Sequence, residues 1–417
     1  MRLRVLVPVL LALAAAAGLV LGAVLPGSGS SATPAAAGSS PSGDGASGAP
    51  SGDGGSPAAS QQPSDQPSAS YDPGANNGSV SDANAPQPDF PVEPLAKGAK
   101  PPQFVVVSFD GACKDELFKH YLALAERNNA RFVYNLSGLC LIPDAKRFSY
   151  KPPLKPAGTS AIGFAEATYV PDRIRNMTTA YLRGDEIASH ALGHFCGAGG
   201  VGDWSKSDWQ SEFDQFDTFL DNWRDYQDPK LVADVQALPF NSSVIKGIRT
   251  PCLEGQRSNM WPVWKKAGFT YDASQSGQLE WPEKNSYGIW ELPLQTIKIA
   301  GFRDNLSMDY NLMCAQNDCS KEASQAKADK IRASTLKSYN DALRAVCQGN
   351  RAPFFIGNHF NTWVKSAYLN SLTDFVDGAK EVCPDVQFVT NVDVVKWLDA
   401  QTPATLKALR AKGVQGY

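Results

Sequence analysis

Residues 104–111, with the sequence FVVVSFDG, decide the fold class of this chain. The run is mostly β-branched and aromatic, which is typical of a strand buried on both faces of a parallel sheet. It ends at Asp110 and Gly111, so an ionisable residue stands at the carboxyl end of the strand. In parallel α/β folds this end of the sheet carries the chemistry, and Asp110 is therefore a candidate catalytic residue.

Strand and helix patterns alternate along the chain from this run onward. Further apolar runs predict strands over residues 130–136, 246–249, 288–294, 353–357 and 386–389. Helical spacing of apolar residues predicts helices over 115–128, 209–226, 259–268 (interrupted by Pro262), 334–346, 366–382 and 391–400. The alternation predicts one large α/β domain with a mostly parallel sheet, either open or closed as a barrel.

The first 98 residues have a different composition. Arg2 and Arg4 precede an apolar run over residues 5–25, so residues 1–27 are expected to be a signal peptide or an N-terminal membrane anchor. Residues 28–98 are rich in Ser, Gly, Pro, Ala and Asp and have almost no apolar bulk, which predicts a disordered linker. Both readings of the first segment predict an exported domain over residues 99–417, secreted or attached to the outer face of the cell membrane.

Overall composition excludes some classes of function and indicates a redox environment. The chain has 417 residues and a formal net charge of −3, which argues against a general nucleic-acid binder. All eight cysteines follow residue 98, and an even count in an exported chain indicates disulfides. Cys314 and Cys319 are close enough in sequence for a local bridge, whereas spacing does not decide the other pairs.

Histidine is scarce, which narrows the choice of any imidazole-dependent site. The chain has four histidines, His120, His190, His194 and His359. His190 and His194 have the i, i+4 spacing that would put both rings on one face of a helical turn, where they can share a divalent metal ion. His120 falls inside a predicted helix and is expected to be structural.

Several of these segments together resemble the polysaccharide deacetylases of carbohydrate esterase family four. The segments are 104–111 (FVVVSFDG), 184–194 (GDEIASHALGH), 249–251 (RTP), 306–310 (LSMDY) and 354–359 (FFIGNH), and their order is that of the family motifs. The resemblance implies a distorted parallel (β/α) barrel. It also implies a divalent-metal enzyme, with zinc as the expected ion, that removes N-acetyl or O-acetyl groups from a polysaccharide such as peptidoglycan or a chitin-like glycan.

The resemblance also implies a role for each of seven residues. The implied roles are metal ligands for His190 and His194, general base for Asp110, a positioning partner of that base for Arg249, an oxyanion-binding backbone N–H for Cys252, general acid for His359, and an orienting carboxylate for Asp309.

The chain departs from the family pattern at Gly111. The family has a second aspartate there, which is normally the third metal ligand. Three outcomes are open: Asp110 takes the ligand role, another carboxylate such as Asp115 reaches the metal, or metal binding is weak and activity is lost. The last outcome would leave a catalytically impaired glycan-binding protein on the same fold, and hydrolysis of a small amide is a further alternative. The polymer, the oligomeric state and the fate of the N-terminal segment stay open.

Overall fold

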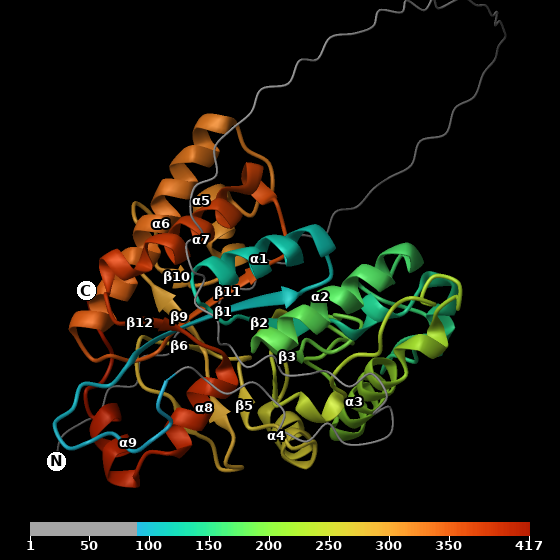
Figure 1. The fold of residues 1–417 in the computed structure, drawn as a ribbon, viewed down its shortest axis with the longest axis horizontal. Coiled ribbons are helices and arrows are strands. Elements are labelled where there is room, and N and C mark those ends of the chain that lie inside the picture. Colours follow the sequence, from blue (N-terminus) through green and yellow to red (C-terminus); the bar gives the residue numbers. More distant parts are fainter. Residues whose placement is uncertain (1–89) are drawn as a thin grey trace, which may run out of the picture. The chain divides into compact units, whose positions relative to one another are not determined.

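The computed structural model describes residues 90–417, and the predicted signal segment and most of the predicted linker lie outside this part. Strands and helices alternate as the sequence pattern predicts (Figure 1). The strands are β1 (Gln103–Gly111), β2 (Val133–Leu136), β3 (Glu186–Ser189), β4 (Gly247–Ile248), β5 (Tyr271–Asp272), β6 (Ser276–Gly277), β7 (Glu283–Lys284), β8 (Trp290–Glu291), β9 (Leu294–Ile297), β10 (Asn305–Leu306), β11 (Phe354–His359) and β12 (Val386–Phe388). The helices are α1 (Asp115–Arg127), α2 (Val170–Arg183), α3 (Lys206–Asp221), α4 (Arg257–Lys266), α5 (Asp309–Asn317), α6 (Gln325–Gln348), α7 (Trp363–Val382), α8 (Asn391–Asp399) and α9 (Pro403–Arg410).

The main sheet is parallel across most of its width. Its strands follow the order β11-β1-β2-β3-β4-β5-β8-β7, with an antiparallel pair, β7 and β8, at one edge. The register brings the last residues of neighbouring strands together, since Asp110 of β1 lies opposite Asn135 of β2 and His359 of β11. Polar side chains from three strands therefore meet at one end of the sheet.

A second, three-stranded sheet curls the structure towards a closed barrel. β6 follows β5 and runs parallel to β9, just as β5 runs parallel to β8. β10 pairs with β9, and Met308 after it forms a parallel bridge to Gly357 of β11. The side-chain amide of Gln295 on β9 donates to the carbonyl of Pro353 (2.9 Å) and accepts from the backbone N–H of Phe355 (3.0 Å). The predicted distorted parallel barrel is confirmed.

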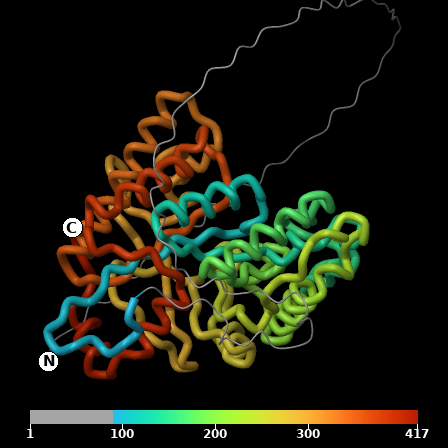
Figure 2. Tube along the Cα trace, viewed as in Figure 1, coloured from blue at the N-terminus to red at the C-terminus, as the bar shows by residue number. Residues whose placement is uncertain are grey.

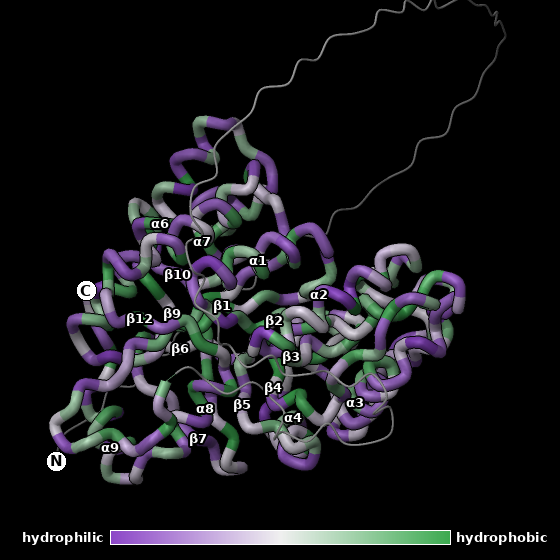
Figure 3. The backbone as a smooth tube through the Cα atoms, in the orientation of Figure 1, coloured by the Kyte–Doolittle hydropathy of each residue, from purple (hydrophilic) through white to green (hydrophobic). Residues whose placement is uncertain are grey.

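Alternate side chains of β1 belong to two different hydrophobic clusters. Val105 and Val107 pack into the larger cluster, together with buried residues of α1, α2, α6 and α7. Phe104 and Val106 pack into a smaller cluster inside the curled sheet, together with residues of α8. Figure 3 shows apolar stretches along the strands and hydrophilic stretches on the outer helices. Because side chains alternate along a strand, Asp110 shares the inner face with Phe104 and Val106.

The sequence explains why helix α1 forms after the first strand. Phe118, Leu122 and Ala125 are buried at helical spacing, Asp115 lies in the first turn and Arg127 in the last. These end charges complement the helix dipole. The helix predicted over residues 115–128 is confirmed to within one residue.

The predicted interruption of α4 is also wrong. Pro262 lies inside α4, which runs from Arg257 to Lys266 without a break. Pro262 donates no N–H and its ring crowds the carbonyl four residues earlier, so the helix loses one hydrogen bond there, but it continues to Lys266.

All eight cysteines are paired. The predicted local bridge between Cys314 and Cys319 is confirmed. The other bridges, which the sequence left open, are Cys113–Cys140, Cys196–Cys252 and Cys347–Cys383.

The first described residues lie against the C-terminal helices, as the blue and red segments of Figure 2 show. The side-chain amide of Gln401 accepts from the N–H of Leu95 (2.7 Å) and donates to the carbonyl of Glu93 (3.0 Å). Phe90 packs on Phe104, with ring centroids 5.0 Å apart. Within residues 90–417, no helix combines the length and the apolar character needed to cross a bilayer.

Candidate active site

A cavity of about 460 Å³ opens at the carboxyl ends of the strands. Four of the predicted site residues line it: Asp110, His190, His194 and His359. The inner face of the barrel thus gathers side chains from β1 and β11 and from the loop after β3. A larger cavity of about 550 Å³ is lined by residues at the opposite, amino-terminal ends of strands, such as Glu186 and Thr270, and by none of the predicted site residues.

Asp110 is a buried carboxylate with two strong donors. Its Oδ1 atom accepts from the guanidinium of Arg249 (2.9 Å) and from the amide of Asn135 (2.8 Å). Burial raises the pKa of Asp110, but the charges of Arg249 and of the nearby histidines and the Asn135 hydrogen bond outweigh it and lower that pKa to about 2. Because the pKa of His190 is itself well below 7, Arg249 is the main cation at neutral pH. The carboxylate is therefore ionised and fixed in place, as a general base requires.

His190 has a buried ring with one free nitrogen. Its Nδ1 donates to the carbonyl of Arg249 (2.7 Å), which leaves a lone pair on Nε2. Nε2 is buried and has no hydrogen-bond partner within the described residues. Burial lowers the pKa of His190 to about 4, so the ring is neutral at pH 7. A buried, neutral imidazole with a free nitrogen fits the donor chemistry of zinc.

His194 lies near His190, but the predicted helical turn between them is wrong. The ring centroids of the two histidines are 5.0 Å apart. Residues 190–194 form an irregular loop in which Ala191 and His194 have φ angles of 56° and 54°. The backbone N–H of His190 donates to the carbonyl of Leu136 (2.8 Å), which extends the sheet ladder by one residue. Burial lowers the pKa of His194, so both rings are neutral donors at pH 7.

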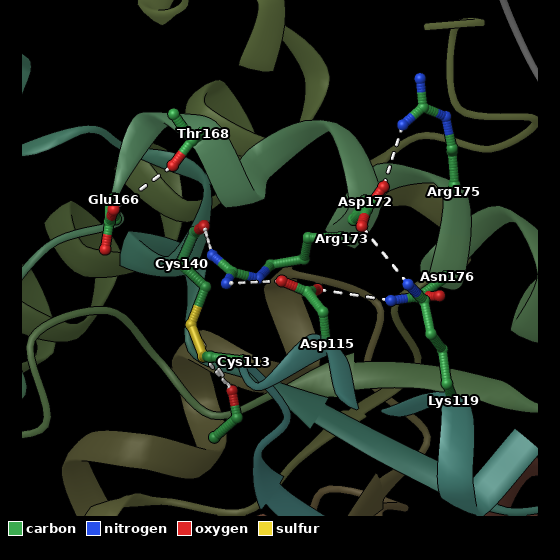
Figure 4. Close-up of polar contacts among 11 residues, drawn as sticks. Cys113, Asp115, Lys119, Cys140, Glu166, Thr168, Asp172, Arg173, Arg175 and Asn176 are labelled. Carbon is green, nitrogen blue, oxygen red and sulfur yellow. Dashed lines mark hydrogen bonds and ion pairs between the residues drawn. A yellow bond between two sulfur atoms is a disulfide. The ribbon is translucent and has the colours of Figure 1, made fainter. Parts of the chain in front are cut away.

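The carboxylate of Asp115 is bound to other side chains. Figure 4 shows it between Arg173 and Asn176, with contacts of 3.4 and 3.3 Å. Asp115 also does not line the cavity that contains the histidines. The hypothesis that Asp115 reaches the metal therefore gains no support from its position.

Two clusters of three possible metal ligands occur in residues 90–417, and neither contains His190. One cluster joins His194 to Cys196 and Cys252, but these two sulfurs form a disulfide and so cannot act as thiolate ligands. The site therefore offers two imidazoles and a nearby carboxylate, Asp110, which suits an open, weakly held divalent ion better than a closed structural site.

His359 and Asp309 form a pair in which the aspartate is fully buried and the histidine is partly exposed to the cavity. The Nδ1 of His359 lies 2.7 Å from Oδ1 of Asp309, whose Oδ2 accepts from the N–H of His359 (2.8 Å) and from the amide of Asn361 (2.6 Å). Burial alone lowers the pKa of His359, but the charge of Asp309 and its hydrogen bond raise it above the ordinary value. The arrangement favours a protonated imidazole, as a general acid requires.

Three residues lie away from this constellation. Cys252 is exposed and does not line the cavity, and its φ angle is 55°; the role of its N–H remains a prediction. His120 lies on α1, with Nε2 3.1 Å from Oγ1 of Thr373, which fits the expected structural role. Asp272 is buried and accepts from Ser274 and Trp261, so it is also structural.

Sequence reasoning missed residues that hold the site in shape. Asn135 and Asn361, which bind the two aspartates, follow or end buried strands and were visible as polar residues there. Glu212 of α3 is fully buried and accepts from the N–H groups of Leu192 (2.8 Å) and Gly193 (3.4 Å). The sequence pattern could have indicated Glu212, because an acidic residue on the apolar face of an amphipathic helix is expected to have a buried partner.

We expect Glu212→Ala to weaken metal binding, because Glu212 supports the loop between His190 and His194. Tyr150 holds the carboxylate from the other side, at 2.9 Å. Zinc affinity should fall by about 10–100-fold, the usual effect of losing a supporting partner. Stability should also fall by about 1–3 kcal/mol, because buried donors lose their acceptor. Titration calorimetry with zinc and thermal unfolding measure the two effects.

Glu212→Gln is the matched control. Its side-chain oxygen still accepts from the loop, and its amide can donate to the oxygen of Tyr150, so zinc affinity should stay close to that of the unaltered protein. Equal zinc affinity in the alanine and unaltered proteins would rule out this supporting role.

Comparisons with known proteins retrieve solved structures alone: no family profile and no curated sequence matches the chain. A protein from Mycobacterium smegmatis, provisionally assigned as a polysaccharide deacetylase, is 14% identical over 75% of this chain and 96% of its own, with a TM-score of 0.44. The family-four esterase domain of a multidomain xylanase from the hindgut metagenome of Trinervitermes trinervoides is 12% identical over 72% and 92%, with a TM-score of 0.37. A family-four pseudoenzyme from Bacillus anthracis, BA3943, is 8% identical over 72% and 66%, with a TM-score of 0.34. At these scores, fold and function rest on the sheet and side chains described above.

Proposed function

We propose that this chain is an exported, metal-dependent hydrolase that removes N-acetyl or O-acetyl groups from a polysaccharide such as peptidoglycan or a chitin-like glycan. One observation carries the proposal: an ionised Asp110, two neutral imidazoles and a carboxylate-bound imidazole line one cavity. Amide hydrolysis needs a base for water, stabilisation of the oxyanion and an acid for the leaving nitrogen, and this set supplies candidates for each.

In the proposed reaction, Asp110 accepts a proton from the attacking water. Arg249 and Asn135 keep its carboxylate ionised and aimed into the cavity. His359 donates a proton to the leaving nitrogen, and Asp309 stabilises the charged ring. His190 and His194 would hold a divalent ion such as zinc, which when bound lowers the pKa of water and polarises the acetyl carbonyl. The backbone N–H of Cys252 remains the proposed oxyanion donor.

The direct test is acetate release by the purified full chain. N-acetylglucosamine oligomers and peptidoglycan are supplied with zinc, cobalt or manganese, and acetate is measured. Release that stops on chelation and returns with metal supports the proposal. Absence of release from every acetylated glycan with every metal would contradict it.

Gly111 favours a second candidate, a glycan-binding protein on the same fold that has lost activity. No cluster of three ligand atoms in residues 90–417 contains His190, so metal binding is expected to be weak. This candidate predicts glycan binding that survives chelation and is unaffected by loss of His190. Export, in both cases, is proposed from Arg2, Arg4 and the apolar run that follows them.

We expect Asp309→Asn to lower the pH at which activity is lost on the alkaline side of the pH profile. An acid must be protonated, so activity is lost as the pH rises through the pKa of His359. The nearby charges of Asp309 and Asp110 raise this pKa, whereas burial and Arg249 lower it. Removing the charge of Asp309 therefore lowers the pKa and moves the alkaline limb of kcat/KM to lower pH. The rate should also fall by roughly 100-fold or more, because the acid is lost at neutral pH.

The measurement is a pH profile of acetate release for both proteins. Asp272→Asn, another buried aspartate away from the cavity, is the control and should leave the alkaline limb in place. An Asp309→Asn profile with an unshifted alkaline limb would contradict the assignment of His359 as the acid.

A further inference from the structure

The candidate active-site cavity carries two positive charges without ion-pair partners. Asp110 is paired with Arg249, and Arg173 with Asp115 and the carbonyl of Cys140 (Figure 4). Within residues 90–417, the ammonium groups of Lys114 and Lys321, which line the cavity, form no ion pair.

Among the described residues that line the cavity, one acid without an ion-pair partner, Glu166, partly balances these lysines. Glu166, which also lines the cavity, is the acceptor for Thr168 Oγ1 at 3.3 Å (Figure 4). The cavity therefore has a net positive charge before any metal ion is added. Residues 90–417 contain 37 lysines and arginines and 36 aspartates and glutamates, so their net charge is close to zero and the excess is local to the cavity.

Lys321 is presented by a tightly bound loop. The disulfide Cys314–Cys319 closes the chain just before it. The side-chain amide of Asn317 donates to the carbonyls of Ser320 (2.6 Å) and Glu322 (3.0 Å), on either side of the lysine. The carbonyl of Lys321 itself accepts from the N–H of Val364 (2.7 Å). A backbone fixed on both sides reduces the entropy lost when the side chain binds a ligand.

The Trp363 ring contacts both the exposed Lys321 side chain and the proposed acid, His359. The ammonium lies 5.0 Å from the centroid of the Trp363 ring, within the range of a cation–π contact. The same ring lies 5.5 Å from the ring of His359. Because the lysine and the histidine already contact this ring, we assign Trp363 to positioning Lys321 near the reacting group.

We infer that the substrate is an anionic glycan, with a carboxylate or phosphate near the acetylated sugar that binds Lys321 and Lys114. The inference rests on the proposed function and narrows its substrate class. An ammonium binds an anion with short, charge-assisted hydrogen bonds, and a neutral glycan would leave both charges unused. Lys114, which precedes α1 beside the disulfide Cys113–Cys140, provides the second charge at the same cavity.

The test compares matched probes with the full chain. One probe is a set of acetylated glycan strands with free carboxylates; the second is the same strands after methyl esterification; the third is a strand that carries phosphate. Lys321→Met keeps the apolar stem on Trp363 and removes the charge. For the carboxylate strands, KM should rise about tenfold, the scale of one lost charge-assisted contact. KM for the esterified strands should not change. Lys407→Met, on α9, is the control for general charge effects.

The outcomes separate this inference from the proposed function. Equal kcat/KM on free and esterified strands in the unaltered protein would overturn the anionic preference while leaving a deacetylase. The same would follow if Lys321→Met raised KM equally for both probes. Absence of acetate from all three probes would reject the deacetylase, and calorimetric binding then decides the inference. Anion-dependent binding that is lost in Lys321→Met supports it, and equal binding of free and esterified strands overturns it. Comparison of the phosphate strand with the carboxylate strands shows which of the two anions the lysines prefer.

Discussion

Replacement of His190 by alanine should abolish metal binding and acetate release together. His190 has the buried, unpartnered Nε2 atom and a ring kept neutral by burial, so it contributes the better prepared of the two imidazoles. With two imidazoles rather than three protein ligands, the loss of one leaves a single strong donor. Zinc affinity should fall by at least about 100-fold, since even supporting partners are worth up to that much. Titration calorimetry and metal analysis of the purified protein measure this effect.

The matched control is His120→Ala, the histidine outside the cavity. Its ring contacts Thr373, and its loss should leave zinc affinity and acetate release unchanged. Thermal unfolding of both variants separates a lost ligand from a lost fold, because His190 also donates to the carbonyl of Arg249. If the folded His190→Ala protein releases acetate at the original rate, the proposed metal-dependent reaction is wrong. Glycan binding that persists in that protein would then favour the non-catalytic alternative.

The sequence predicted strands and helices well where buried residues form a continuous run or recur at helical spacing. The run over residues 104–111 is buried along nearly its whole length, and its β-branched residues predicted a central strand. Local sequence patterns, in contrast, do not predict the order of the strands in the sheet. The closure of the barrel depends on Gln295 and Met308, which bond to β11 across long sequence separations. These contacts form only when the sheet has curled, so neither residue carries a local signal.

The motifs predicted four residues that line one cavity, but they did not predict the local backbone geometry. The i, i+4 spacing of His190 and His194 suited a helical turn, whereas tertiary contacts hold a loop with two positive φ angles. Glu212, distant in sequence, supplies the acceptor for that loop. Similarly, Asp115 suggested a third ligand by proximity to Gly111, but Arg173 on α2 binds its carboxylate. In both cases a partner from a later helix decided the conformation.

Introducing the missing carboxylate with Gly111→Asp should strengthen metal binding. In the family whose motifs the sequence resembles, an aspartate at this position is a metal ligand, and a Cβ added to Gly111 would meet no atom within 4 Å. The φ angle of 84° opposes the change, because an L-residue there costs about 1–2 kcal/mol, although aspartate tolerates this region better than most residues. The binding free energy gained from a third protein ligand should exceed this strain energy. Zinc affinity should therefore rise about tenfold or more. Acetate release at limiting zinc should rise with it.

Gly111→Ala is the control that makes this prediction specific. It introduces the same backbone strain without a carboxylate, so its stability should fall as in the aspartate variant while its zinc affinity stays at the original level. Calorimetric zinc titration of the two variants side by side therefore isolates the contribution of the carboxylate. Equal affinities would mean that the side chain at position 111 does not reach the metal, and that the weak site of His190 and His194 has another cause. A higher affinity without faster acetate release would mean that metal occupancy does not limit the reaction, because Asp110, Arg249 and His359 are unchanged in both variants.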